Sequence, residues 1–188
     1  MKAEIILILG GARSGKSRFA QRLASGLGQS VLYVAPLVPQ DEEMRRRVEL
    51  HQKARPSHWR TLEAPNNIAR AIREHTNDAE VVILDCLTLL VSNYMQNAPD
   101  PEDIDALESV ILDELSQLLE RKRQKNASLI IVSNEVGMGL VPPYPSGRAY
   151  RDLLGKANQF ISERADKVYM MIAGLPLELK ALSARDEE

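Results

Sequence analysis

The residues best suited to chemistry lie near the start of the chain, in the run Gly10-Gly11-Ala12-Arg13-Ser14-Gly15-Lys16-Ser17. This run fits the pattern G-x-x-x-x-G-K-S, in which a glycine-rich turn surrounds a phosphate with backbone N–H groups. Lys16 can reach the terminal phosphates of a nucleotide, and the Ser17 hydroxyl can ligate Mg²⁺. Gly10 and Gly15 let the backbone approach an anion closely because they carry no Cβ. The pattern predicts a site for a nucleoside triphosphate.

The segments on either side of this run have the character that such a site needs. An apolar strand candidate, Ile5–Leu9, precedes it, and a helical segment, Lys16–Leu27, follows it. The positive end of that helix would add to the attraction for phosphate. A chance glycine turn is the alternative explanation, but strand, loop and helix occur in the required order.

Apolar runs alternate with helical segments along the rest of the chain. The apolar runs are mostly continuous, which is typical of strands buried on both faces of a parallel sheet. The expected strands are Ile5–Leu9, Val31–Ala35, Trp59–Leu62, Val81–Asp85, Leu129–Ser133 and Val168–Ala173. The expected helices are Lys16–Leu27, Asp41–Lys53, Asn67–Glu74, Glu102–Lys125 and Gly147–Arg164. This order predicts an α/β fold of P-loop NTPase type, a doubly wound, mostly parallel sheet with helices on both faces, in one domain over residues 1–188.

The composition disfavours several classes of partner. A net charge of -2 and an aromatic content of 4% argue against nucleic acid or an anionic membrane as the main partner. The single cysteine, Cys86, excludes an internal disulfide and a multi-cysteine zinc site. Because the first strand candidate begins at residue 5 and no apolar run is long enough to span a membrane, we expect no signal peptide and a cytoplasmic protein.

Polar residues follow several of the expected strands. Ligands bind at the carboxyl ends of strands in an open α/β sheet, so we expect Ala35-Pro36-Leu37, Glu63, Asp85 and Ser133–Gly137 to lie near the phosphate loop. Asp85 is placed to hold Mg²⁺ directly or through water. Its alternative role is to cap the segment that follows.

His51 stands near the end of the charged helical segment Asp41–Lys53. Met44, Val48 and His51 are spaced at i, i+4 and i+7, so they share one helical face that points toward protein or a cleft. From spacing alone, a partly buried histidine at a helix end is favoured over a catalytic one. The chain has three scattered histidines and no cysteine pair, so a metal-ligand set is not expected.

Residues 132–152 form a second dense segment, rich in glycine and proline, that predicts a long structured loop after a core strand. Such loops are usually functional. Arg148, Tyr150 and Arg151 at its end are donors suited to a phosphorylated or amide-rich ligand. The alternative is a surface loop that packs on itself.

Taken together, these motifs resemble one enzyme family over nearly the whole chain, from about Ile5 to Gly174. The phosphate loop G-G-A-R-S-G-K-S, the pattern H-x-x-x-R-P-x-x-W that begins at His51, and the block V-S-N-E-V-G-M-G carry the resemblance. The family is the bifunctional adenosylcobinamide kinase / adenosylcobinamide-phosphate guanylyltransferase family of cobalamin biosynthesis. The last two motifs are far more specific than the phosphate loop.

The resemblance implies two reactions at one nucleotide site. In the first, the aminopropanol hydroxyl of adenosylcobinamide attacks the γ-phosphate of ATP or GTP, with Lys16 as the catalytic cation. In the second, His51 attacks the α-phosphorus of GTP, expels pyrophosphate and forms a GMP–histidine phosphoramidate. Adenosylcobinamide phosphate then displaces His51 and gives the GDP-linked product.

The resemblance also implies the contacts, the cofactors and the assembly. Mg²⁺ would be held by Ser17 and Asp85, and Glu63 could read guanine by accepting hydrogen bonds from N1–H and the 2-amino group. The implied nucleotide contacts are Gly10, Gly11, Ala12, Arg13, Ser14, Gly15, Lys16, Ser17, Ala35, Pro36, Leu37, Gln52, Lys53, Ala54, Arg55, Glu63 and Asp85. The corrinoid would bind around residues 134–152, and the protein would form a homotrimer.

Pro36 departs from the family pattern, because other members carry threonine after the second strand. Proline lacks the hydroxyl and the backbone N–H of threonine, so a contact through either group is not expected here.

Three rival functions fit the phosphate loop. A regulatory GTPase would need an N-K-x-D sequence, which is absent. A RecA-like nucleic-acid module is disfavoured by the acidic balance and the few aromatic residues. A single-activity small-molecule kinase would keep Lys16 and Asp85 but would not need His51.

Overall fold

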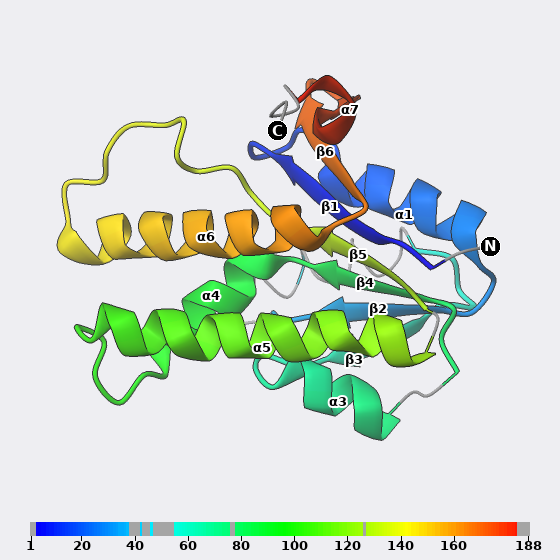
Figure 1. Ribbon diagram of the computed structural model, residues 1–188, viewed down its shortest axis with the longest axis horizontal. Helices are drawn as coiled ribbons and strands as arrows, with labels where there is room; N and C mark the ends of the chain where they lie inside the picture. Colours follow the sequence, from blue (N-terminus) through cyan, green and yellow to red (C-terminus); the bar gives the residue numbers. More distant parts are fainter. Residues whose placement is uncertain are drawn as a thin grey trace, which may run out of the picture.

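The computed structural model describes residues 3–37, 42, 46, 55–75, 78–125 and 127–183, whose strands form a seven-stranded sheet (Figure 1). The strand order is β3-β2-β4-β5-β1-β6-β7, and every neighbouring pair is parallel except β6 and β7. The strands are β1 (Ile5–Gly10), β2 (Val31–Ala35), β3 (Arg60–Glu63), β4 (Val81–Asp85), β5 (Ser128–Val132), β6 (Lys167–Ile172) and β7 (Leu175–Glu178). The predicted α/β fold with a mostly parallel sheet is confirmed.

Helices cover both faces of the sheet (Figure 1). They are α1 (Lys16–Leu27), α3 (Ile68–His75), α4 (Leu87–Gln96), α5 (Ile104–Lys125), α6 (Pro145–Arg164) and α7 (Leu179–Leu182). Successive strand residues point to opposite faces. Leu7 therefore joins the core on the side of α3 to α6, whereas Ile8 packs with Phe19 of α1 on the other side.

Most expected elements are present, with small shifts at their ends. The helix predicted from Gly147 begins at Pro145, because proline suits the first turn of a helix, where its missing N–H is not needed. The strand predicted from Trp59 begins one residue later, and Trp59 instead donates its backbone N–H to Pro56 in a turn. Apart from residues 42 and 46, the predicted helix Asp41–Lys53 lies outside the described residues.

Three elements, α4, β7 and α7, were not expected from the sequence. Helix α4 follows β4 almost directly and is largely apolar, so it offers no charged face to mark it as a surface helix. Strand β7 forms a hairpin with β6 through Ala173 and Gly174, which both have positive φ. Pro176 breaks the usual strand pattern, but β7 is an edge strand, where a missing N–H is tolerated.

A buried carboxylate links the helices on the side of α3 to α6. Glu114 of α5 is only 6% exposed. Its Oε1 accepts the backbone N–H of Ala69 in the first turn of α3 at 2.9 Å, and its Oε2 accepts the hydroxyl of Tyr94 of α4 at 3.0 Å. One side chain therefore satisfies a donor on each of two neighbouring helices, which offsets the cost of burying its charge.

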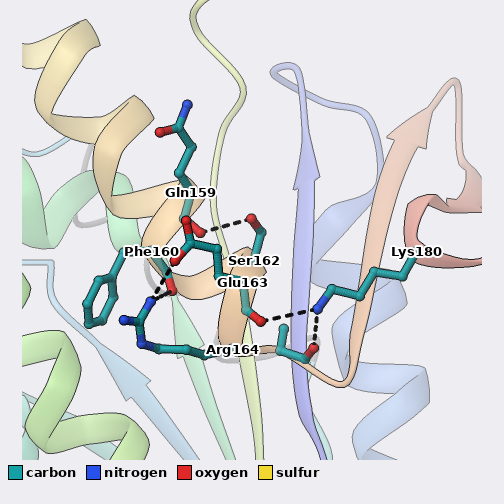
Figure 2. Close-up of polar contacts among 7 residues, drawn as sticks. Gln159, Phe160, Ser162, Glu163, Arg164 and Lys180 are labelled. Atoms are coloured by element: carbon teal, nitrogen blue, oxygen red, sulfur yellow. Dashed lines mark hydrogen bonds and ion pairs between the residues drawn. The ribbon is translucent and has the colours of Figure 1, made fainter. Parts of the chain in front are cut away.

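The short helix α7 is tied to the end of α6 by Lys180 (Figure 2). The Lys180 ammonium donates to the backbone oxygen of Ala165 at 2.6 Å and to that of Glu163 at 3.4 Å. Carbonyls at the end of a helix lack intrahelical partners and carry a partial negative charge. The lysine therefore stabilises α6 and holds the segment after β7 against it.

Candidate nucleotide-binding site

The phosphate loop lies between the end of β1 and the start of α1, as the motif requires. Gly10 has φ 148°, and Gly15, the N-cap of α1, has φ 95°. Both values lie in the region that side chains disfavour. A Cβ on Gly10 would also lie 2.6 Å from the backbone oxygen of Met171 and 2.8 Å from Ser14 Oγ. Only glycine fits at this position.

Two distant segments hold the phosphate loop in place. The backbone N–H of Gly174, in the β6–β7 turn, donates to the oxygen of Ser14 at 3.0 Å. The backbone N–H of Glu135, just after β5, donates to the oxygen of Gly10 at 3.2 Å. The shape of the phosphate loop therefore depends on one contact near the centre of the sheet, after β5, and on another at the edge of the sheet, in the β6–β7 turn.

Lys16 is folded back over the loop and is only 8% exposed. Its ammonium donates to the backbone oxygen of Gly11 at 2.6 Å. Burial lowers the pKa of Lys16, while the nearby Cys86 and Asp85 act in the opposite direction. A phosphate entering the loop would supply the negative charge that this buried cation lacks.

The loop forms one wall of a cavity of about 860 Å³, a size that suits a nucleotide. It brings together most of the described residues expected at the site. Those that line it are Ala12, Arg13, Ser14, Gly15, Lys16, Ser17, Ala35, Leu37, Arg55, Glu63 and Asp85. The convergence expected at the carboxyl ends of the strands is therefore found for β1, β2, β3 and β4.

The remaining expected residues fall into two groups. Gly10, Gly11 and Pro36 are described but are not among the lining residues. Pro36 is buried, and its backbone oxygen accepts the Asn93 amide at 2.7 Å, so here this residue contributes a carbonyl and no donor. The expected nucleophile and the three residues after it, His51, Gln52, Lys53 and Ala54, lie outside the described residues.

Asp85 belongs to a small polar group with Tyr33 and Arg55. The Tyr33 hydroxyl donates to Asp85 Oδ2 at 2.6 Å, and the Arg55 guanidinium carbon lies 3.4 Å from the centroid of the Tyr33 ring. Asp85 does not cap the following helix, because the N-cap of α4 is Cys86. The capping alternative for Asp85 is therefore wrong.

Several lining residues were missed at the level of sequence. They are Arg18, Tyr33, Cys86, Thr88, Leu89, Ser92 and Val132. Tyr33 could have been found, because it lies two residues before Ala35 on one strand and so points to the same face. Thr88 and Ser92 are spaced i, i+4 on α4, so recognising that helix would have placed both of them together.

The segment after β5 contributes to the cavity at both of its ends. Asn134 and Tyr150 line it, and Asn158 of α6 donates its side-chain amide to the backbone oxygen of Asn134 at 3.1 Å. Arg148 was expected as a ligand donor. It instead donates to the backbone oxygens of Pro142 and Pro143, at 3.1 and 2.9 Å.

The polar groups of the cavity suit an anion accompanied by Mg²⁺. Ser14 Oγ and Arg55 Nε are buried, and neither finds a hydrogen-bond partner among the described residues. Ser17 and Asp85 supply the hydroxyl and carboxylate oxygens that Mg²⁺ prefers, and phosphates and water would complete its shell. In the described ranges no three His, Cys, Asp or Glu side chains gather as metal ligands, so a site built from protein groups alone is not found there.

The sheet, the loop and the cavity define a nucleotide-binding α/β protein of P-loop NTPase type. The solved structure of the RadB recombinase aligns with a TM-score of 0.50 at 16% identity, covering 90% of this chain and 74% of that one. At that identity the likeness establishes the fold alone.

No helix in the described part of the chain combines the length and the apolar character that a membrane crossing requires.

The chain belongs to the cobinamide kinase / cobinamide phosphate guanyltransferase family, whose sequence profile matches residues 6–179. It is 38% identical over 181 residues to the bifunctional adenosylcobalamin biosynthesis protein CobU of Escherichia coli (strain K12), with 94% of this chain and 99% of that protein covered. It is 42% identical over 174 residues to the bifunctional adenosylcobalamin biosynthesis protein CobP of Pseudomonas aeruginosa, covering 93% and 96%. The resemblance inferred from the motifs is confirmed.

Proposed function

We propose that this chain is a bifunctional enzyme of adenosylcobalamin biosynthesis. It phosphorylates adenosylcobinamide with ATP or GTP, and it then transfers GMP from GTP to adenosylcobinamide phosphate, releasing pyrophosphate. Membership of the family and the names of the relatives, which describe bifunctional proteins, support two activities over a kinase alone.

The observation that carries the proposal is the convergence of anion-binding and carboxylate groups in one cavity. Lys16 and the amino end of α1 face the same space as Asp85, Arg55 and Glu63. That set suits a triphosphate at one end and a base at the other, because cations and helix N-termini attract phosphate while a carboxylate accepts from guanine N–H groups.

In the kinase step, the chain supplies position and charge. Lys16 neutralises the γ-phosphate, and the loop amides hold it in line with the attacking hydroxyl. Ser17 and Asp85 would hold Mg²⁺, which when bound offsets the negative charge of the phosphates.

In the guanylyl-transfer step, we assign the nucleophile to His51. A neutral imidazole nitrogen attacks the α-phosphorus, the bond to pyrophosphate breaks, and a phosphoramidate to GMP forms. The phosphate of the acceptor then attacks the same phosphorus and restores His51. The first described residue after it, Arg55, lines the cavity, which supports placing this segment near the nucleotide.

The acceptor is proposed to bind along residues 134–150. Both ends of this segment line the cavity, while Met138, Leu140, Val141 and Tyr144 between them are 63–96% exposed. Arg148 donates to the backbone oxygens of Pro142 and Pro143, and these hydrogen bonds hold the loop that carries the exposed apolar side chains. A corrinoid whose hydroxyl reaches the γ-phosphate is too large for the cavity, so its body would lie on such a surface.

Labelling tests the histidine mechanism directly. The wild-type protein is incubated with GTP that carries ³²P at the α-phosphate, denatured, and assayed for label that is stable in alkali and labile in acid. His51→Ala is expected to take up no label and to lose guanylyl transfer while it keeps phosphorylation of adenosylcobinamide. His58→Ala, which changes an exposed histidine close by in the sequence, is the matched control and should label normally. An unlabelled wild-type protein would favour the single-activity kinase.

Assembly as a homotrimer is also part of the proposal, and it rests on the family resemblance. Large apolar side chains are exposed on the hairpin and helix at the edge of the sheet, among them Leu175 and Leu182, each 69% exposed. An assembly would remove such surface from water. Light scattering on the purified protein measures its mass, and a monomer would contradict this part of the proposal.

A further inference from the structure

Tyr33 lines the cavity and contacts two of its polar groups at once. It is the central residue of β2, pairs with Thr61 of β3 and Ile83 of β4, and is only 2% exposed. Its hydroxyl is 2.6 Å from Asp85 Oδ2, and its ring face lies 3.4 Å from the guanidinium carbon of Arg55.

We propose that Tyr33 is a positioning residue for nucleotide binding, whose hydroxyl orients Asp85 and whose ring orients Arg55. The inference rests on the proposed nucleotide site and assigns a role to a residue outside the expected contacts. A purely structural core residue at this position would need only the ring, because a phenylalanine would fill the same volume.

The hydroxyl acts on the metal side of the site. A phenol donating to a carboxylate is a short, charge-assisted hydrogen bond, and it fixes the rotamer of the acceptor. With Oδ2 of Asp85 engaged by Tyr33, Oδ1 is the oxygen left to reach Mg²⁺ or a water bound to it.

The ring acts on the cationic side of the site. A guanidinium over an aromatic face is attracted by the ring quadrupole and lies in a defined orientation. The Arg55 Nη1 also donates to Thr61 Oγ1 at 3.3 Å, and Thr61 is the ladder neighbour of Tyr33. Two adjacent strands therefore hold Arg55 at the edge of the cavity, and its Nε is buried without a hydrogen-bond partner in the part of the chain that the structure describes.

Two substitutions separate the two contacts. Tyr33→Phe removes the hydroxyl and keeps the ring, whereas Tyr33→Leu removes both. Tyr169→Phe is the matched control, because Tyr169 packs edge-on against Phe19 and does not line the cavity. The dissociation constant of a fluorescent N-methylanthraniloyl derivative of GTP is measured in Mg²⁺ and, separately, in EDTA.

The expected results differ between the two buffers. Tyr33→Phe should weaken binding in Mg²⁺ by about tenfold, the loss of one hydrogen bond to a charged group, and should leave binding in EDTA unchanged. Tyr33→Leu should in addition weaken binding in EDTA by about fivefold, because Arg55 loses its ring. In an Asp85→Asn background, Tyr33→Phe should add no further loss in Mg²⁺.

Three outcomes would overturn the inference. If Tyr33→Phe keeps the wild-type ratio of the two dissociation constants, the hydroxyl does not act through the metal side. If Tyr33→Leu binds in EDTA as tightly as Tyr33→Phe does, the ring does not position Arg55. If the wild-type protein binds the probe in neither buffer, the proposed function fails together with this inference, a result easily distinguished from the other two.

Discussion

Replacing Gly10 with alanine tests whether the phosphate loop depends on close contact with the C-terminal hairpin. The new Cβ would lie 2.6 Å from the backbone oxygen of Met171, and the alanine would have to keep φ at 148°. Gly10 and Met171 are paired in the β1–β6 ladder, so relief of the contact requires the two strands to separate. A flexible side chain could move aside, but a ladder carbonyl cannot do so without loss of hydrogen bonding.

The size of the effect follows from these two penalties. A residue held in a disfavoured backbone region costs about 1–3 kcal/mol, and an overpacked contact in a rigid part of the core costs a similar amount. We expect Gly10→Ala to lower the free energy of unfolding by about 3 kcal/mol, which corresponds to a fall of about 10 °C in the melting temperature of a protein of this size. Urea unfolding followed by circular dichroism measures the first quantity, and a thermal scan measures the second.

Gly11→Ala is the matched control. It changes the neighbouring glycine of the same loop, where an added Cβ meets nothing within 4 Å. Its free energy of unfolding should stay within about 0.5 kcal/mol of the wild type. The reasoning is refuted if the two variants unfold at the same urea concentration, because the contact with Met171 would then carry no cost.

Three further predictions concern other parts of the molecule. Glu114→Ala should lower the free energy of unfolding by about 3 kcal/mol, because it removes the acceptor of the Ala69 N–H and the Tyr94 hydroxyl. Glu108→Ala, on the same helix α5, breaks an ion pair with the half-exposed Lys156 of α6 and should cost less than about 1 kcal/mol; equal losses in urea unfolding would contradict this. GTP binding should be coupled to proton uptake in alkaline buffers, because burial lowers the pKa of Lys16 in the free protein and the incoming phosphates raise that pKa. Calorimetry in two buffers of different ionisation enthalpy measures the proton uptake. Identical apparent binding enthalpies in the two buffers would refute the prediction. Leu140→Ser should raise the KM for adenosylcobinamide several-fold and leave the KM for GTP unchanged. Val110→Ser is the control on an exposed face of α5 and should change neither KM. If Leu140→Ser leaves the KM for adenosylcobinamide unchanged, the acceptor does not bind at this loop.

The sequence predicts the centre of the sheet and the position of the glycine-rich loop between β1 and α1 well. The core strands are continuous apolar runs, and the spacing of Gly10, Gly15 and Lys16 has a direct steric and electrostatic meaning. The carboxyl-end rule then placed Ala35, Glu63 and Asp85 at one cavity, where the structure brings them together.

What the sequence did not predict depends on contacts between distant segments. Arg148 was predicted to be a ligand donor, but it donates to the backbone oxygens of Pro142 and Pro143 in its own loop. The spacing of residues in the sequence does not reveal such hydrogen bonds. Tyr33 looked like an ordinary apolar strand residue, and only the packing of β2 between β3 and β4 sets its hydroxyl against Asp85. Helix α4 was missed because it is buried on several sides and carries no charged residue, so it lacks the charged face that marks a surface helix.

The contacts of Met171 and Gly174 with the phosphate loop have a consequence for synthesis on the ribosome. The glycine-rich loop is made well before Met171 and Gly174, the residues that shape it, because they follow much later in the sequence. A nascent chain that ends before β6 therefore contains the whole G-x-x-x-x-G-K-S motif but lacks the strand and the turn that shape the loop. We therefore expect the phosphate loop to take its final shape only after β6 has paired with β1 and the β6–β7 turn has reached Ser14.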